Sequence, residues 1–153
     1  MDTYLLRSVD EAVDDGGPST HAAEARSQDR TPSVPDAARR AGAGDEEAVP
    51  VLRVADADAA LSWYRRLGFV KQWEHRFEPG LPAFVEIARG PVRLFLSEHV
   101  GDARPGTLVY LRVRDVDTVA DEFGVPVTTA PWAREVELRD PDGNRLRVGT
   151  PAE

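Results

Sequence analysis

The sequence predicts an α+β domain made of two βαβββ repeats that form a curved mixed sheet, preceded by a polar tail. Three observations predict this fold. A heptapeptide recurs within the chain, a helical pattern and then short β-branched segments follow each copy, and large apolar residues are scarce in the first 47 positions. An internal repeat indicates the architecture because each copy is one supersecondary unit.

Residues 1–47 form the predicted tail. They hold 11 acidic and 5 basic residues, against 16 and 14 in the remainder, so the tail carries most of the net charge of −8. Its Gly-Pro and Gly-Ala-Gly segments and scattered charges are typical of a largely disordered chain, although apolar residues near its start are spaced as in a short helix. The predicted organisation is therefore an acidic tail over 1–47 and a folded domain over 48–153.

The recurring heptapeptide begins each repeat. Leu-Arg-Val-Ala-Asp-Ala-Asp at 52–58 returns as Leu-Arg-Val-Arg-Asp-Val-Asp at 111–117, with five of seven residues identical at an offset of 59. Each copy reads as a short strand followed by an Asp suited to cap a helix. The first helix carries its apolar face on Ala60, Leu61, Tyr64 and Leu67 and ends near Gly68, and the second runs from Val116 to Phe123 and ends at Gly124.

Three strands follow each helix. Their predicted ranges are 70–77, 83–88 and 92–96 in the first repeat and 126–130, 134–139 and 145–149 in the second. The closing strands also match, because Arg-Leu-Phe-Leu at 93–96 resembles Arg-Leu-Arg-Val at 145–148, now at an offset of 52. One such repeat leaves an apolar sheet face uncovered, whereas two together make a curved sheet whose concave side can hold a ligand.

The segment Asp140-Pro-Asp-Gly-Asn144 joins the last two strands. Its paired carboxylates could serve acid–base chemistry. Turn chemistry explains them better, since Asp and Asn bond to the local backbone and Gly143 supplies a positive φ.

Composition excludes several classes of function. The chain has no cysteine, which excludes disulfides, thiolate metal sites and a Cys nucleophile. Its negative charge argues against nucleic acid and anionic lipid as partners and suits a cationic ligand better. The start of the chain lacks the basic and then apolar pattern of a secretory signal, and no segment is apolar enough to span a bilayer. A cytoplasmic location is the expectation.

Within residues 48–153, several motifs are similar to those of the vicinal-oxygen-chelate superfamily of glyoxalases, extradiol dioxygenases and bleomycin-binding proteins. The more selective motif is Pro131-Trp-Ala-Arg-Glu135 followed by Leu138-Arg-Asp-Pro-Asp-Gly-Asn144, which resembles the bleomycin-resistance branch. The supporting segments are Ala48-Val-Pro-Val-Leu52, the helix end Trp63-Tyr64 with Leu67-Gly68-Phe69, and Leu94-Phe-Leu-Ser97. The resemblance implies the glyoxalase/bleomycin-resistance fold.

The superfamily's enzymes bind a divalent metal at four strand positions. The resemblance places these positions at Val49, Phe95, Leu108 and Arg147, and none of the four side chains can ligate such a cation. His75 and His99 lie off these positions and His21 lies in the tail, so a surface or turn role is favoured for each. We therefore expect no metal and no cofactor.

The resemblance also implies a drug-binding cleft in which aromatic rings stack on a flat ligand. Trp132 matches the stacking Trp, and Trp73 and Phe77 lie in the segment that supplies the facing ring. Tyr110 and Arg112, on the first strand of the second repeat, would line the floor. Each has an ordinary alternative: Trp73 and Phe77 as core residues, Trp132 as a loop residue, and Tyr110 and Arg112 as alternating strand residues.

Two acidic residues are candidates for meeting a cationic ligand. Glu86 lies on a middle strand and Glu135 follows the Trp132 loop, although either could be a solvated strand residue. The resemblance further implies a homodimer that exchanges its first strand at a Pro, and Pro50 is in the matching place. A Pro near a strand start is also explained by its missing N–H, which sheet edges tolerate.

The sequence thus predicts an antibiotic-binding resistance protein that sequesters a bleomycin-like cationic glycopeptide, or a related small molecule, without metal or chemistry. The alternative is an enzyme of the same superfamily, a lyase, isomerase or dioxygenase acting on a small vicinal-oxygen substrate. A third possibility is a structural or regulatory module whose acidic tail is the functional part. The four positions without metal ligands favour the binding protein.

Overall fold

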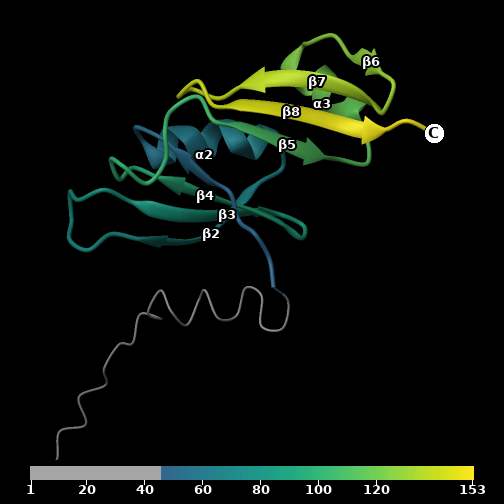
Figure 1. The fold of residues 1–153 in the computed structure, drawn as a ribbon. Coiled ribbons are helices and arrows are strands. Elements are labelled where there is room, and N and C mark those ends of the chain that lie inside the picture. Colours follow the sequence, from purple (N-terminus) through teal and green to yellow (C-terminus); the bar gives the residue numbers. More distant parts are fainter. Residues whose placement is uncertain (1–45) are drawn as a thin grey trace, which may run out of the picture. The chain divides into compact units, whose positions relative to one another are not determined.

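The computed structural model describes residues 46–153, so the predicted tail, apart from its last two residues, lies outside the described part. Each repeat forms its own four-stranded mixed sheet with one helix, which confirms the predicted fold class (Figure 1). The first repeat contains β1 (Val51–Arg53), α2 (Ala57–Arg66), β2 (Val70–His75), β3 (Phe84–Arg89) and β4 (Val92–Ser97). The second contains β5 (Leu108–Arg112), α3 (Val116–Phe123), β6 (Thr128–Ala130), β7 (Ala133–Arg139) and β8 (Arg145–Pro151).

The two sheets have the same topology. Their strand orders are β1-β4-β3-β2 and β5-β8-β7-β6, with the first pair of each sheet parallel and the other pairs antiparallel. Val51 lies opposite Phe95 in the first sheet and Tyr110 lies opposite Arg147 in the second. The predicted offsets of 59 and 52 therefore relate residues that are equivalent in space.

Both helices begin and end where the repeat predicts. The carboxylate of Asp56 accepts hydrogen bonds from two backbone N–H groups at the start of α2, and Asp115 does the same for α3. Hydrogen bonds from the hydroxyl and the backbone N–H of Thr118, the hydroxyl bond being the larger cause, hold the pKa of Asp115 below its usual range. Gly68 and Gly124 follow the helices with φ of 83° and 64°, a left-handed conformation that suits glycine.

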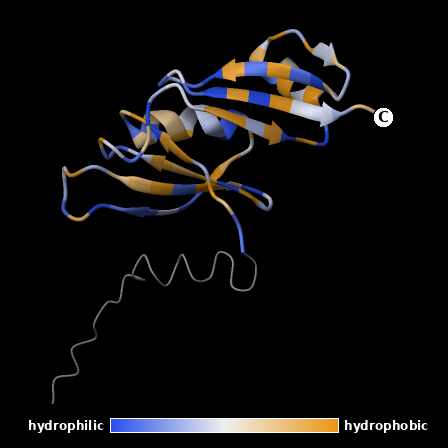
Figure 2. Ribbon diagram, viewed as in Figure 1, coloured by the Kyte–Doolittle hydropathy of each residue, from blue (hydrophilic) through white to orange (hydrophobic). Residues whose placement is uncertain are grey.

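The core is shared by the two repeats. Apolar and polar residues alternate along most of β7 and β8 (Figure 2). Val136, Leu138, Leu146 and Val148 of these strands join a cluster that draws on both helices and both sheets. Trp63 of α2 packs on Phe123 of α3, with ring centroids 5.2 Å apart. The guanidinium of Arg66 lies 4.1 Å from the Phe123 ring centroid and pairs with Glu122 at 3.0 Å.

The turn between β7 and β8 confirms the turn interpretation of its acidic residues. One oxygen of Asp140 accepts the backbone N–H groups of Asp142 and Asn144 at 2.9 and 2.8 Å. The turn also joins the repeats, which the sequence does not reveal. The hydroxyl of buried Tyr64 donates to the other Asp140 oxygen at 2.8 Å, and the Asn144 amide donates to the Arg53 carbonyl at 2.9 Å.

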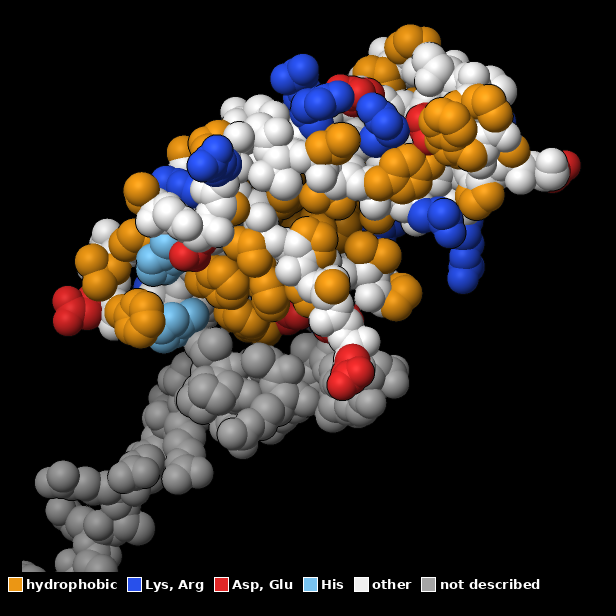
Figure 3. Space-filling model, in the orientation of Figure 1, with side chains coloured by type: hydrophobic (Ala, Val, Ile, Leu, Met, Phe, Trp, Pro, Cys, Tyr) orange, Lys and Arg blue, Asp and Glu red, His pale blue; other side chains and the backbone are white. Residues whose placement is uncertain are grey.

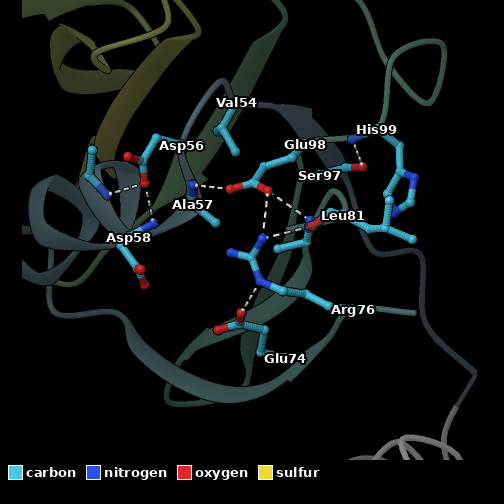
Figure 4. A network of polar contacts seen from close by, with 12 residues as sticks. Val54, Asp56, Ala57, Asp58, Glu74, Arg76, Leu81, Ser97, Glu98 and His99 are labelled. Atoms are coloured by element: carbon cyan, nitrogen blue, oxygen red, sulfur yellow. Dashed lines mark hydrogen bonds and ion pairs between the residues drawn. The ribbon is translucent and has the colours of Figure 1, made fainter. Parts of the chain in front are cut away.

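Three predicted strand ends are wrong by two residues, one of them that of β8, which is predicted to end at 149 but continues to Pro151. The strand predicted over 70–77 ends at His75, because the next residues form a loop held by Glu98 (Figure 4). Glu98 accepts the backbone N–H groups of Ala57 and Ala83 at 2.9 and 2.7 Å, and Arg76 donates to the Leu81 carbonyl at 2.8 Å. The strand predicted over 126–130 begins at Thr128, since Pro126 has no N–H to extend the pairing with β7. No helix within residues 46–153 is long and apolar enough to cross a membrane.

Candidate ligand-binding site

Trp132 is the most exposed aromatic ring of the second sheet. It lies in the tight turn between β6 and β7, where its carbonyl accepts a hydrogen bond from Ala152 at 3.0 Å. The residue is 63% exposed, yet its indole N–H donates to the Glu135 carboxylate at 2.7 Å. Glu135 itself is buried. The ring is therefore presented to solvent while its orientation is fixed from below.

Tyr110 shares the same carboxylate. Its hydroxyl donates to Glu135 at 2.8 Å, to the oxygen that also accepts from Trp132. Desolvation of the hydroxyl, and then this hydrogen bond, raise the pKa of Tyr110. The contact requires Gly149, because a Cβ at that position would collide with the Tyr110 hydroxyl. One buried carboxylate thus aligns two aromatic side chains.

These groups border an open pocket of about 370 Å³ on the second sheet, lined by Tyr110, Arg112, Trp132, Ala133 and Pro151. Trp132, Tyr110 and Arg112, three of the predicted binding residues, therefore lie together, with Glu135 beneath them. Their roles in binding remain predictions.

The first sheet carries an aromatic cluster on its corresponding face. The ring centroid of Trp73 lies 5.9 Å from that of Phe84 and 5.7 Å from that of Phe95, and the two Phe centroids are 4.9 Å apart. Trp73 and Phe84 help to line a second open pocket of about 440 Å³, together with His75, Phe77, His99 and Asp102. Figure 3 shows a hydrophobic surface beside the two histidines of the described chain.

Phe77 lies in the loop after β2 and is 73% exposed, so the core alternative is wrong for this residue. Its ring packs against His75, with centroids 4.6 Å apart. Trp73 is half-buried within the aromatic cluster. Sequence reasoning missed Phe84, although its spacing of two residues from Glu86 on β3 places both on one sheet face.

Glu86 lies two residues from Phe84 on β3 and is 4% exposed. In the sheet register it faces Trp73 on β2 and Phe95 on β4. One carboxylate oxygen pairs with Arg93 at 3.3 Å. The interpretation of Glu86 as a solvated strand residue is therefore wrong.

The four positions implied for a metal bring no ligands together. The backbone N–H of Phe95 donates to the carbonyl of Pro50, beside Val49, while Leu108 is 46% exposed and Arg147 lies 3.7 Å from Glu137. Within the described residues, no group of three or more His, Asp or Glu side chains is arranged to hold a metal ion.

Pro50 directly precedes β1, which pairs with β4 of its own chain. The exchange of this strand between two copies stays a prediction.

The chain has two βαβββ repeats, and the sheet of each repeat borders a pocket lined by aromatic residues. This is the glyoxalase fold. The chain belongs to the glyoxalase superfamily, because the family model described as "Glyoxalase superfamily protein" matches residues 36–152. No curated protein matches it.

Three solved structures illustrate the relationship. The bleomycin-binding protein from bleomycin-producing Streptomyces verticillus, complexed with copper(II)-bleomycin, is 32% identical, and the alignment covers 71% of this chain and 98% of that one, with a TM-score of 0.53. TnmS3, an antibiotic-binding protein from Streptomyces sp. CB03234, is 27% identical over 70% of this chain and 98% of its own, with a TM-score of 0.57. A glyoxylase/bleomycin resistance protein/dioxygenase domain from Frankia sp. EAN1pec covers 71% of this chain and 98% of its own at 19% identity and a TM-score of 0.59, which shows the fold alone.

Proposed function

We propose that this protein binds an antibiotic of the bleomycin type, a flat heteroaromatic compound with a cationic part, and sequesters it without chemical change. The observation that carries the proposal is the Trp132 platform, a residue that is 63% exposed but whose indole is anchored to buried Glu135. An exposed ring with a fixed orientation stacks on a ligand with little conformational entropy to lose. The antibiotic-binding relatives at 32% and 27% identity support the class of ligand.

The first sheet supplies the rings that would face Trp132. In one chain the Trp132 pocket and the pocket beside Trp73 and Phe84 have no lining residue in common. Two copies arranged as a homodimer would bring the aromatic face of one chain opposite Trp132 of the other, with Pro50 at the point where the first strand could cross over. Sedimentation of the purified chain tests this arrangement, and a monomer at micromolar concentration would contradict it.

A calorimetric titration with bleomycin tests the proposal. Trp132→Ala should weaken binding by about 1 kcal/mol or more, as loss of an anchoring aromatic usually does. Trp132→Phe, which keeps a ring but loses the bond to Glu135, should retain part of the affinity. If no heat of binding is seen at high micromolar bleomycin, bleomycin is not the ligand. If Trp132→Ala binds bleomycin with unchanged affinity, Trp132 does not stack on the drug.

The competing class is a metal-dependent enzyme of the same superfamily. Val49, Phe95 and Leu108 offer no lone pair to a cation and Arg147 would repel one, which favours binding over catalysis. Elemental analysis should find no stoichiometric zinc, iron, nickel or manganese in the purified protein, and one metal per chain would favour the enzyme instead.

A further inference from the structure

We propose that the first sheet contains a built subsite for a planar nitrogen cation of the ligand, an amidinium or guanidinium, with the Glu86 carboxylate as its counter-ion. This inference rests on the proposed function, because it names the group that the first sheet would take from the ligand. Its evidence comes from two buried atoms and from a comparison with the second repeat.

The first line of evidence is a pair of buried polar atoms without partners. Among residues 46–153, nothing accepts a hydrogen bond from the Trp73 indole N–H and nothing donates one to Glu86 Oε2. The two residues face each other across β2 and β3. A carboxylate oxygen that is buried without a donor is costly, so such groups call for an explanation.

The second repeat shows what this carboxylate lacks. The register makes Glu137 the equivalent of Glu86, since Glu137 faces Arg147 as Glu86 faces Phe95. Glu137 pairs with Arg145 at 2.8 Å and with Arg147 at 3.7 Å. In the first repeat, Arg93 supplies the equivalent of the Arg145 pair, but Phe95 stands where the second guanidinium would be. In Glu137 the second carboxylate oxygen pairs with Arg147. The equivalent oxygen of Glu86 is Oε2, which has no partner among the described residues.

The surroundings of Glu86 suit a planar cation from outside the chain. Trp73 and Phe95 flank Glu86 in the sheet register, and Phe84 lies two residues away on the same face of β3. A guanidinium or amidinium can stack on such rings while its N–H groups donate to Oε2. The indole N–H of Trp73, which has no acceptor among the described residues, would meet an acceptor atom beside that cation. Because both atoms are buried, a neighbouring side chain must move to admit the ligand, and we assign this movement to Trp73. Trp73 lies on edge strand β2 directly after a register shift, where only one neighbouring strand holds it.

Benzamidine and benzamide test the subsite, since they share a shape and differ in charge. Calorimetry on the full chain should show benzamidine binding in the millimolar range expected of a fragment, at least tenfold tighter than benzamide. Glu86→Gln should weaken benzamidine binding at least tenfold. Glu137→Gln is the matched control, because the Glu137 carboxylate already has two arginine partners. The affinity of this variant for benzamidine should equal that of the unchanged protein.

Phe95→Arg provides a second test that does not depend on removing a charge. It places a guanidinium where the second repeat has Arg147, so benzamidine binding should be lost in a chain whose circular dichroism is unchanged. This variant decides the question if Glu86→Gln fails to fold. Equal binding of the two probes, or benzamidine binding that survives either Glu86→Gln or Phe95→Arg, would overturn the inference.

The bleomycin titration separates this inference from the proposed function. Benzamidine binding that depends on Glu86, in a protein that does not bind bleomycin, would support the cation subsite and contradict bleomycin as the ligand. Bleomycin binding that is equal in the unchanged protein and Glu86→Gln, with no preference for benzamidine, would support the drug and overturn the subsite.

Discussion

The two repeats share one backbone plan and differ in what their sheet faces carry. Three pairs of equivalent positions show the difference, namely Phe84 and Glu135, Phe95 and Arg147, and Val51 and Tyr110, with the residue of the first repeat given first. The first face is thus an aromatic cluster around one half-paired carboxylate. The second is a network in which each carboxylate has two partners.

This difference indicates how a duplicated fold can make two unlike surfaces. Topology, capping and turn residues are retained in both repeats, because they fix the backbone. The side chains on the sheet face are free to differ, since they point away from the shared core. Binding chemistry therefore changes at a few strand positions without a change of fold.

The largest expected effect concerns the joint between the repeats. Tyr64→Phe removes the buried hydrogen bond to Asp140 and should lower the free energy of unfolding by about 1.5–3 kcal/mol, the range for bonds to charged groups. Tyr110→Phe is the matched control, because its bond to Glu135 is also 2.8 Å long but the residue is 43% exposed. That loss should be below about 1 kcal/mol. Urea denaturation measures both, and equal costs would contradict the role of burial.

The same tyrosine should make stability depend on alkaline pH. Burial, and then the charge of Asp140, raise the pKa of Tyr64, so the folded chain keeps a proton that the unfolded chain releases near pH ~10. The resulting stability is fully present below that pH and is lost as the pH rises through it. Urea denaturation over roughly pH 8 to 11 should show a shallower decline for Tyr64→Phe than for the unchanged protein. Parallel declines would show that Tyr64 ionises in the folded chain.

The next effect concerns Gly149, whose equivalent in the first repeat is Ser97. Gly149→Ala should force the Tyr110 ring away from Glu135 and cost about 1 kcal/mol, at the low end for overpacking because the ring can swing toward solvent. In a Tyr110→Val background, which copies Val51, the same change should cost clearly less, because only the Glu135 Cγ, 3.2 Å from the added Cβ, is left in close contact. Additive costs in the double variant would show that the collision with Tyr110 is not the cause.

The fold could be predicted because its signals are local. Asp56 and Asp115 begin helices, Gly68 and Gly124 end them, and the offsets of 59 and 52 follow from matching heptapeptides and closing strands. The strand end after His75 could not be predicted, since it depends on Glu98, a residue more than twenty positions away.

The candidate site could be predicted only in part. Trp132 and Glu135 are three residues apart, so their proximity is visible in the sequence, whereas the bond from Tyr110 to Glu135 depends on strand order. The aromatic cluster around Glu86 depends on the register of β3 with both neighbours, which is why Phe84 was missed. The pairing of Tyr64 with Asp140 links residues 76 positions apart and has no sequence signal.

The smallest expected effect comes from giving the second repeat the side chain of the first. Arg147→Phe removes a 3.7 Å ion pair between side chains that are 36% and 39% exposed, so the free energy of unfolding should fall by less than about 1 kcal/mol. Arg145 still pairs with Glu137, and water can replace Arg147 at this exposed carboxylate. We therefore expect that the variant gains no benzamidine binding in calorimetry, although it copies the pairing of Glu86. A gain would show that a facing ring and a half-paired carboxylate suffice without burial. The absence of a gain would show that a facing ring and a half-paired carboxylate do not suffice on an exposed sheet face.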